Sequence, residues 1–391
     1  SFNAHLNLSG GSLNKNLDGN DSVVFYGDLF LTGYALSVAA DTITVASGVT
    51  VSTSDAAGVA GKITLDGHHI SLEAGAALLA EGAVGGGNAA DGDIEINAVD
   101  NTSLWTPGVD IDISEVDFSM ASGTRIRGRD VTVLATSDGR QVYDASSGSL
   151  PATALDLIGS IIEGLATFEV TVSYVQARAT IDIAAGSSIV ADTFTAYASS
   201  FADISVMPTV AVLFGAAAGV AITDAIVTVG GDITTTGDLA LRSTADQTLN
   251  VVADPSAIMG IAASATVTVI ISESTVHVTD DAALNVGGDL YLLAGTMDRT
   301  RAMARSSAGK DGAIGVAIAV GVEKGTTNAL LDGRDTPPAS AATFLPWTVA
   351  HLGAQAVLAS VSGRYYGMDR DHRWDRTERW YRAAVLGDAP H

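Results

Sequence analysis

The sequence contains no cysteine, which excludes disulfide bridges and thiolate metal sites. This lack does not fix the compartment, because a repetitive core needs no covalent staple. The chain opens Ser-Phe-Asn-Ala, without a methionine or a basic leader, so we expect either a removed signal or an internal fragment. Its 391 residues suffice for two or more domains and a large core.

Basic residues are scarce. Lys and Arg number 20 against 44 Asp and Glu, for a formal net charge of −24. The tail from Arg334 holds 7 Arg and 6 acids, so the remainder carries the other 13 basic and 38 acidic residues. Such a surface repels nucleic acid and anionic membranes, and we expect neither as a partner.

A long helical period is also lacking before the tail. Apolar residues instead occupy every second position of short segments such as Ile43–Val45 and Asp130–Leu134, the pattern of strands with one face inward. The uncharged run Ile204–Thr223 is long enough to span a membrane. It contains Pro208, and similar runs recur at one phase of a longer repeat, so we interpret it as buried strand and expect no membrane span.

That longer repeat has three copies, each leading to an aspartate. The copies begin at Ala179, Ala225 and Ser274, and their aspartates are Asp192, Asp238 and Asp289, separated by 46 and 51 residues. Such a unit implies stacked coils that bury their faces against one another. A propeller has a similar period, but its four-stranded blades and signature turns are not seen. The sequence predicts an all-β parallel β-helix (β-solenoid) over residues 1–329, with a short α/β C-terminal fragment over residues 330–391.

The stretches that follow each copy, such as Ala262–Ile271, are apolar on both strand faces. One face can fill the core, whereas the other needs cover. Either the core widens locally, or the Ala- and Gly-rich outer face packs laterally against another copy of the chain. Self-association through these faces is therefore an expected partnership.

The repeats resemble those of filamentous-haemagglutinin-like large bacterial adhesins. The resemblance rests on the Gly-Asp-Leu-x-Leu unit at Gly237 and Gly288 and on the segment Val316–Ala329. It implies a non-catalytic extracellular or cell-surface β-solenoid, a segment of a large surface or matrix protein that packs into a filament or layer. On this reading the chain is not an enzyme.

Few residues of the first part suggest chemistry. His68 and His69 are adjacent, and adjacent strand residues point to opposite faces, so the pair is not expected to chelate one metal ion. The Asp-rich turns Asp18–Asp21 and Asn88–Asp93 could bind Ca²⁺ through oxygen ligands, although turn chemistry alone explains them. We expect no metal site and no cofactor, with a calcium-stabilised binding module kept as an alternative.

The tail reads as β-α-β-α, with its last helix over Asp371–Leu386. Leu330–Ala341 and Ser362–Arg376 resemble the substrate-domain motifs of cofactor-independent phosphoglycerate mutases. By this resemblance, Arg334, Asp335, Arg370 and Arg376 would hold phosphoglycerate, and guanidinium forks do suit phosphate and carboxylate oxygens.

The resemblance also implies a serine nucleophile and two metal ions in a separate domain, with Mn²⁺ as the metal if the mutase reading holds. We expect that domain to be absent and the fragment, residues 330–391, to be inactive and unable to fold alone. A phosphoglycerate-mutase-related enzyme that interconverts 2- and 3-phosphoglycerate is the alternative function. The switch near Leu330–Gly333, a tetrapeptide that fits both parents, suggests an artificial join rather than a fusion between complete domains.

Overall fold

A computed structural model describes most of the first 331 residues and five positions of the tail. The described residues are 13–16, 22–83, 88–100, 109–144, 168–207, 214–253, 256–257, 261–305, 307–308, 314–331, 374, 378–379 and 381–382. The chain divides into two compact units, Ser1–Leu330 and Leu331–His391. The expected boundary at residues 329 and 330 stays a prediction.

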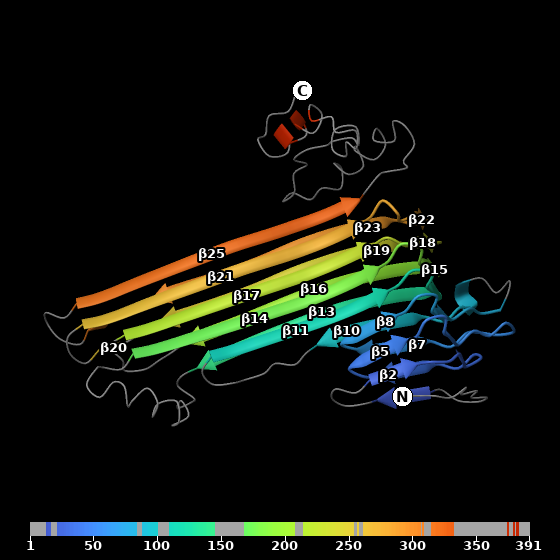
Figure 1. Ribbon diagram of the computed structural model, residues 1–391, viewed down its shortest axis with the longest axis horizontal. Helices are drawn as coiled ribbons and strands as arrows, with labels where there is room; N and C mark the ends of the chain where they lie inside the picture. The colour runs from blue at the N-terminus through green and yellow to red at the C-terminus, as the bar shows by residue number, and fades with distance from the viewer. Residues whose placement is uncertain are drawn as a thin grey trace. The chain divides into compact units, whose positions relative to one another are not determined.

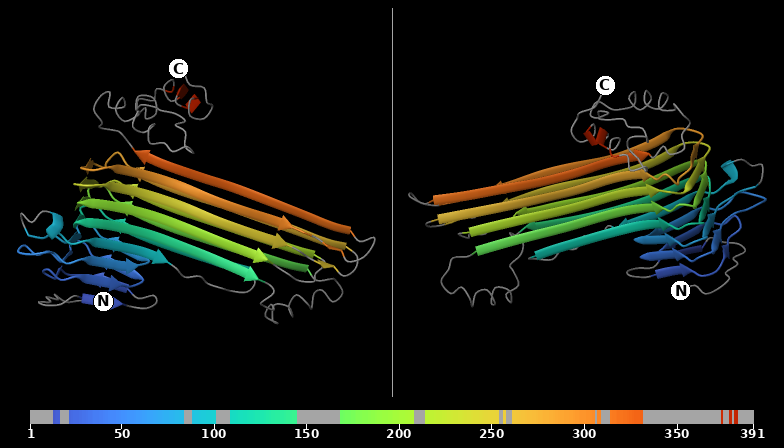
Figure 2. Two further views of the ribbon diagram at one scale, coloured as in Figure 1. Left: turned by 180° about the vertical axis from the view of Figure 1, so that it is seen from behind. Right: turned by 45° about the horizontal axis from the view of Figure 1, so that its top comes forward.

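The first unit is built from three parallel sheets (Figures 1 and 2). Sheet C contains β1 (Leu13–Asn16), β4 (Leu36–Ala39), β7 (Ile63–Gly67), β10 (Ile94–Asp100), β13 (Asp130–Asp144), β16 (Thr193–Met207), β19 (Leu239–Ala253) and β23 (Leu290–Ala304). Sheet A contains β2 (Ser22–Phe25), β5 (Thr42–Val45), β8 (His69–Leu72), β11 (Val109–Met120), β14 (Phe168–Ile183), β17 (Phe214–Val229), β21 (Ile261–Val278) and β25 (Ile314–Leu331). Sheet B contains β3 (Leu29–Phe30), β6 (Thr50–Ser52), β9 (Ala77–Leu79), β12 (Arg125–Arg127), β15 (Ser188–Ala191), β18 (Asp232–Thr235) and β22 (Leu284–Val286).

The chain visits these sheets in rotation, from C to A to B, and each circuit lays one new strand beside the last in every sheet. The two-residue strands β20 (Ser256–Ala257) and β24 (Ser307–Ala308) form a small fourth sheet. One 3₁₀ turn, η1 (Asn88–Ala90), lies between β9 and β10. The all-β prediction is therefore confirmed for the described part of the first unit.

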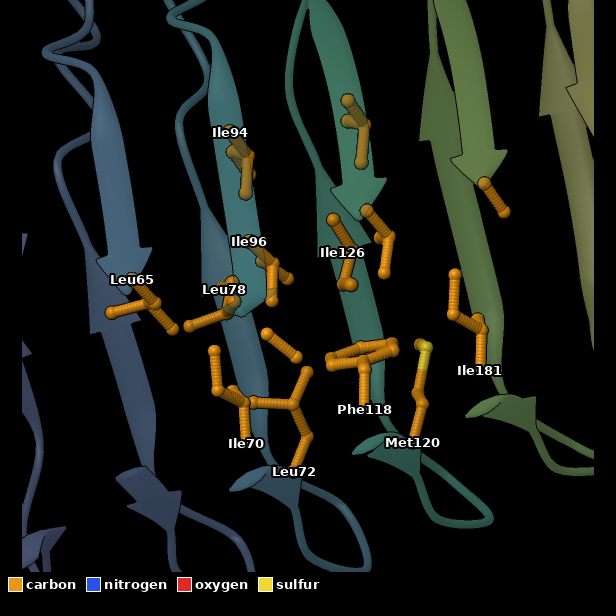
Figure 3. Packing of buried hydrophobic residues seen from close by; sticks show 14 of the residues in the cluster. Leu65, Ile70, Leu72, Leu78, Ile94, Ile96, Phe118, Met120, Ile126 and Ile181 are labelled. Atoms are coloured by element: carbon orange, nitrogen blue, oxygen red, sulfur yellow. The ribbon is translucent and has the colours of Figure 1, made fainter. Parts of the chain in front are cut away.

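Parallel pairing is in register, so like residues stack. Leu65 pairs with Ile96 in sheet C, Ile70 with Phe118 in sheet A, and Leu78 with Ile126 in sheet B. Figure 3 shows these side chains pointing into one interior from all three sheets. All of them are fully buried. Every second residue of a strand thus joins an apolar column that runs along the stack.

The turn from sheet A to sheet B repeats in the same geometry. Gly48, Gly75, Gly123 and Gly186 each have φ between 72° and 77°, the left-handed region that a Cβ disfavours. Each glycine follows a sheet A strand by a few residues and precedes the next sheet B strand. The Gly and Ser turn residues of the sequence therefore mark a corner that every one of these circuits must make.

The circuits change size along the stack, in agreement with the local widening of the core that is one of the two interpretations of the apolar stretches. The sheet A strands β2, β5 and β8 have 4 residues each, whereas β14 and β17 have 16 and β21 and β25 have 18. Sheets A and C are both lengthened (Figure 2). A second apolar core, which includes Val175, Ile204 and Leu249, fills the space between the extensions.

A row of buried polar side chains separates the two cores. Thr223 lies between Ala221 of the second core and Ala225 of the first, and Gln247 lies between Ala245 and Leu249. The Gln247 amide donates to Thr223 Oγ1 and to the Ile271 carbonyl, both at 2.6 Å. These bonds join sheet C to sheet A at a fixed position along the strands.

Substitution of Phe118 by Ala tests the stacked core. Phe118 is fully buried, so the loss of its ring and the cavity left behind should cost about 3–5 kcal/mol. Urea unfolding followed by circular dichroism would measure the change. The matched control is Phe30→Ala, because the Phe30 side chain is 50% exposed and should cost little. Equal losses in the two variants would contradict this assignment of the core.

Candidate functional site

The residues expected to hold phosphoglycerate, Arg334, Asp335, Arg370 and Arg376, lie outside the described residues. Their placement thus stays a prediction. The described positions of the tail are helical, and they fall within the expected helix Asp371–Leu386. At these positions the helical prediction is confirmed.

Two aromatic side chains of this helix are strongly exposed. Trp374 is 72% exposed and Tyr381 is 50% exposed, and their separation of seven residues places them on one helix face. Glu378, which lies between them, is 3.7 Å from Arg382 in an i,i+4 ion pair. Such exposed pairs contribute little stability, so this ion pair adds little to the stability of the helix.

A column of charged residues runs across the outer face of sheet A. Glu115, Arg178, Asp224 and Glu273 are successive register partners in β11, β14, β17 and β21. Burial raises the pKa of Asp224, Arg178 lowers it, and Glu273 and Glu115 raise it further. The column therefore has one arginine beside three carboxylates. The attraction of Arg178 only partly offsets the rise that burial causes in the pKa of Asp224.

A smaller charged group lies on sheet C. The Arg140 Nε donates to Asp138 Oδ1 at 2.8 Å, and the guanidinium lies 5.2 Å from the centre of the Phe201 ring. Burial raises the pKa of Asp203, while Arg140 lowers it. The arrangement is a structural ion pair with a cation–π contact, and among the described residues it does not form a cluster of three or more His, Cys, Asp or Glu that could hold a metal ion.

His68 and His69 contact different carboxylates, as expected for adjacent side chains that point to opposite faces. His68 Nδ1 lies 2.6 Å from Asp41 Oδ1, and its Nε2 lies 3.9 Å from Asp100 Oδ1. His69 Nδ1 contacts Asp117 on β11 instead. Each imidazole thus contacts a carboxylate of a neighbouring circuit, Asp41 or Asp117, and these contacts link successive circuits of the stack.

The Asp-rich turn at Asn88–Asp93 is also engaged by the protein. Asp91 Oδ1 accepts from the backbone of Gly82 at 2.6 Å, and Asp93 pairs with Arg129 at 2.6 Å. Asp18–Asp21 lies outside the described residues. Across the described ranges no three or more His, Cys, Asp or Glu side chains gather to hold a metal ion, so the residues seen there do not fit the Mn²⁺ that the mutase resemblance implies.

The comparisons with known proteins concern the C-terminal part. Residues 311–391 match the family model described as the BPG-independent PGAM N-terminus. The 2,3-bisphosphoglycerate-independent phosphoglycerate mutase of Clostridium novyi is 50% identical over 78 residues, which are 19% of this chain and 15% of that protein. The enzymes of Moorella thermoacetica and Chromobacterium violaceum are 49% identical over 70 residues and 52% over 77, or 17% and 19% of this chain and 14% and 15% of theirs.

The chain therefore spans about 15% of the length of the curated relatives that it matches. No solved structure matches it. The mutase resemblance of the tail is confirmed, and the match begins at residue 311 rather than near residue 330. It thus includes β25, which is also the last strand of sheet A.

These findings correct the main functional interpretation. The non-catalytic adhesin segment is wrong, because the relatives are phosphoglycerate mutases at about 50% identity. The expectation that the chain is not an enzyme is wrong for the same reason, although the match covers a fragment. The adhesin likeness of residues 1–329, with its filament and extracellular descriptions, has no support from the comparisons. The alternative reading, a mutase-related enzyme, is favoured.

The structure also bears on Ile204–Thr223, the uncharged run that we interpret as buried strand and not as a membrane span. Ile204 lies in β16 and residues from Phe214 onward lie in β17, so both described ends are strands. Within the part that the structure describes, no helix is long and apolar enough to cross a membrane.

Replacing Asp224 by Asn tests the charged column. The folded pKa of Asp224 is raised, so its ionisation costs stability above that pKa, and the cost disappears below the unfolded value of about 3.9. We expect the variant to melt at a higher temperature than the parent at pH 7. The difference should shrink as the pH falls towards 4.

Thermal unfolding at several pH values measures this effect. Asp281→Asn is the control, because Asp281 lies exposed in a turn. A stabilisation of the Asp224 variant that is independent of pH, or one matched by the control, would count against a burial cost.

Proposed function

We propose that the protein is related to cofactor-independent phosphoglycerate mutases and that its C-terminal segment binds a phosphoglycerate. The observation that carries this proposal is the identity of about 50% over 70–78 residues. The matched stretch includes Leu330–Ala341 and Ser362–Arg376, which together supply Arg334, Asp335, Arg370 and Arg376.

The charge of the segment supports an anionic ligand. The chain from Arg334 onward has 7 arginines and 6 acids, in a protein of net charge −24. Five of the arginines recur at every third residue from Arg370 to Arg382, and residues three apart are neighbours on a helix. Guanidinium groups suit a phosphoglycerate, since its phosphate and its carboxylate each accept a forked pair of hydrogen bonds from an arginine.

The position of the first motif supports the same ligand. β25 is a strand of a parallel sheet and ends at Leu331, and Arg334 and Asp335 follow within four residues. In an open α/β sheet, the fold class expected for the tail, ligand-binding residues lie just beyond the carboxyl ends of parallel strands. Interconversion of 2- and 3-phosphoglycerate is the activity we propose for the whole protein. The described residues form no cluster that fits Mn²⁺, so no step through that metal follows.

For the first unit we infer a three-sided parallel β-helix, in which β25 supplies the last sheet A strand. The rotation of the chain through sheets C, A and B and the in-register columns support this inference. The unit would then be a rigid carrier for the segment that begins at β25. Its net charge is strongly negative, so it would attract no phosphoglycerate itself.

Calorimetric titration of the full chain with 3-phosphoglycerate tests the proposal. We expect saturable binding, and we expect Arg370→Ala and Arg376→Ala each to weaken it by about tenfold or more, because a charge-assisted hydrogen bond is lost. Arg305→Ala is the matched control, since Arg305 is exposed at the end of the β23 strand and should leave binding unchanged. Absence of binding, or equal weakening by the control, would refute the assignment.

A further inference from the structure

The outer face of sheet A carries an apolar strip that the described residues leave open. The strip comprises the outward-facing residues of Val172–Tyr174 in β14, Ala216–Ile222 in β17, Ala265–Ile271 in β21 and Val316–Val322 in β25. These four strands lie side by side in sheet A (Figure 1). Val267 is 42% exposed and Ile318 is 58% exposed.

The strip is continuous because the strands are in register. Val172 pairs with Ala218, and Ala218 pairs with Val267. The orientation of β25 follows from Gly321. A Cβ added to Gly321 would lie close to Oγ1 of Thr268, whose side chain faces inward. Gly321 therefore faces the interior, and its neighbours Val320 and Val322 face outward onto the strip.

The strip ends sharply in the direction of the strands. The next outward residues of β14, β17 and β21 after Gln176, Ile222 and Ile271 belong to the charged column, which contains Arg178, Asp224 and Glu273. Within the strip no outward side chain is charged. On β25 the outward-facing Lys324 lies beside Ile271, so the boundary between the apolar and the charged rows begins one outward residue earlier on that strand.

We propose that this strip is the interface of a homodimer, in which two copies pack their A sheets face to face. From strand spacing and rise, each copy offers a flat area of roughly 25 Å by 20 Å, or about 500 Å². Two copies would cover about 1,000 Å², which reaches the lower bound of a specific interface. A patch of this size is among the largest that a typical monomer exposes, and such patches are often functional.

The chemistry of the strip favours a second copy over other occupants. Its side chains are mostly Ala, Val and Ile, which give a flat surface without a groove for a helix. A flat sheet packs best against another sheet about 10 Å away, with the strands nearly aligned. The chain's charge of −24 and the lack of Lys or Arg within the strip disfavour an anionic membrane.

Charge also selects the orientation. If the strands of the two copies ran antiparallel, the charged column of each copy would lie beyond the end of its partner's strip. Asp224 and Glu273 would then stay in solvent and would not face each other across the interface. The interface is therefore apolar at its centre and acidic at both ends.

Sedimentation velocity of the full chain over a wide concentration range tests the proposal. We expect a reversible monomer–dimer equilibrium that strengthens with added salt, because salt screens the repulsion between two acidic bodies. Val267→Lys and Ile318→Lys should each weaken dimerisation by about tenfold or more, since each buries an unpaired charge. Both side chains point outward, so circular dichroism should show an unchanged fold.

Leu293→Lys is the matched control, because Leu293 is 55% exposed on the outer face of sheet C. It changes the net charge by the same amount and should leave dimerisation intact. A protein that is monomeric at every concentration would overturn the proposal. So would a dimer insensitive to both strip variants, or a monomer that binds phosphatidylcholine vesicles through the strip. These readouts are independent of phosphoglycerate binding.

Discussion

In-register parallel stacking is the constraint on which the rest of the structure depends. Each circuit lays its strands directly beside those of the previous one. A residue therefore fits the fold only if it packs well against its register partners in the circuits on either side. Leu65 and Ile96, or Leu78 and Ile126, satisfy this requirement with apolar side chains. The repeated glycine corner satisfies it with backbone conformation. At Asp224 the same rule costs stability, since its column holds three carboxylates and one arginine.

The buried polar row shows how the stack accommodates two cores. A long sheet that was apolar throughout could slide along its partner by two residues without exposing any side chain. Gln247 prevents this slip, because its amide must meet Thr223 and the Ile271 carbonyl. Ser137 and Ser114 form a similar bond between β13 and β11 at 2.7 Å. The row therefore replaces some buried apolar side chains with polar ones, and their hydrogen bonds fix the alignment of sheets A and C.

Much of the first unit could be predicted from the sequence, since its period is local. The alternation in Ile43–Val45 and Asp130–Leu134 and the spacing of Asp192, Asp238 and Asp289 identify strands and stacking. The Asp289 backbone does donate to the Asp238 carboxylate at 2.8 Å. The sequence left a wider core and a lateral packing face as alternatives, because a residue such as Ile222 is apolar whether it faces a core or solvent. The likeness to adhesins failed as a guide to function because turn-and-strand units serve many proteins.

β25 explains why the boundary of the mutase-like segment could not be placed from the sequence. The strand satisfies two demands, since it lies beside β21 in sheet A and also begins the matched segment at residues 311–331. In sheet A the strand ends at Leu331, just before the polar residues Asp332 and Arg334. A parallel strand has the same alternation and hydrogen-bonding pattern in a stack of circuits and in an α/β sheet. Only the arginine-containing sequence after Leu331 distinguishes the two, so the arginines carry more functional information than the strand that precedes them.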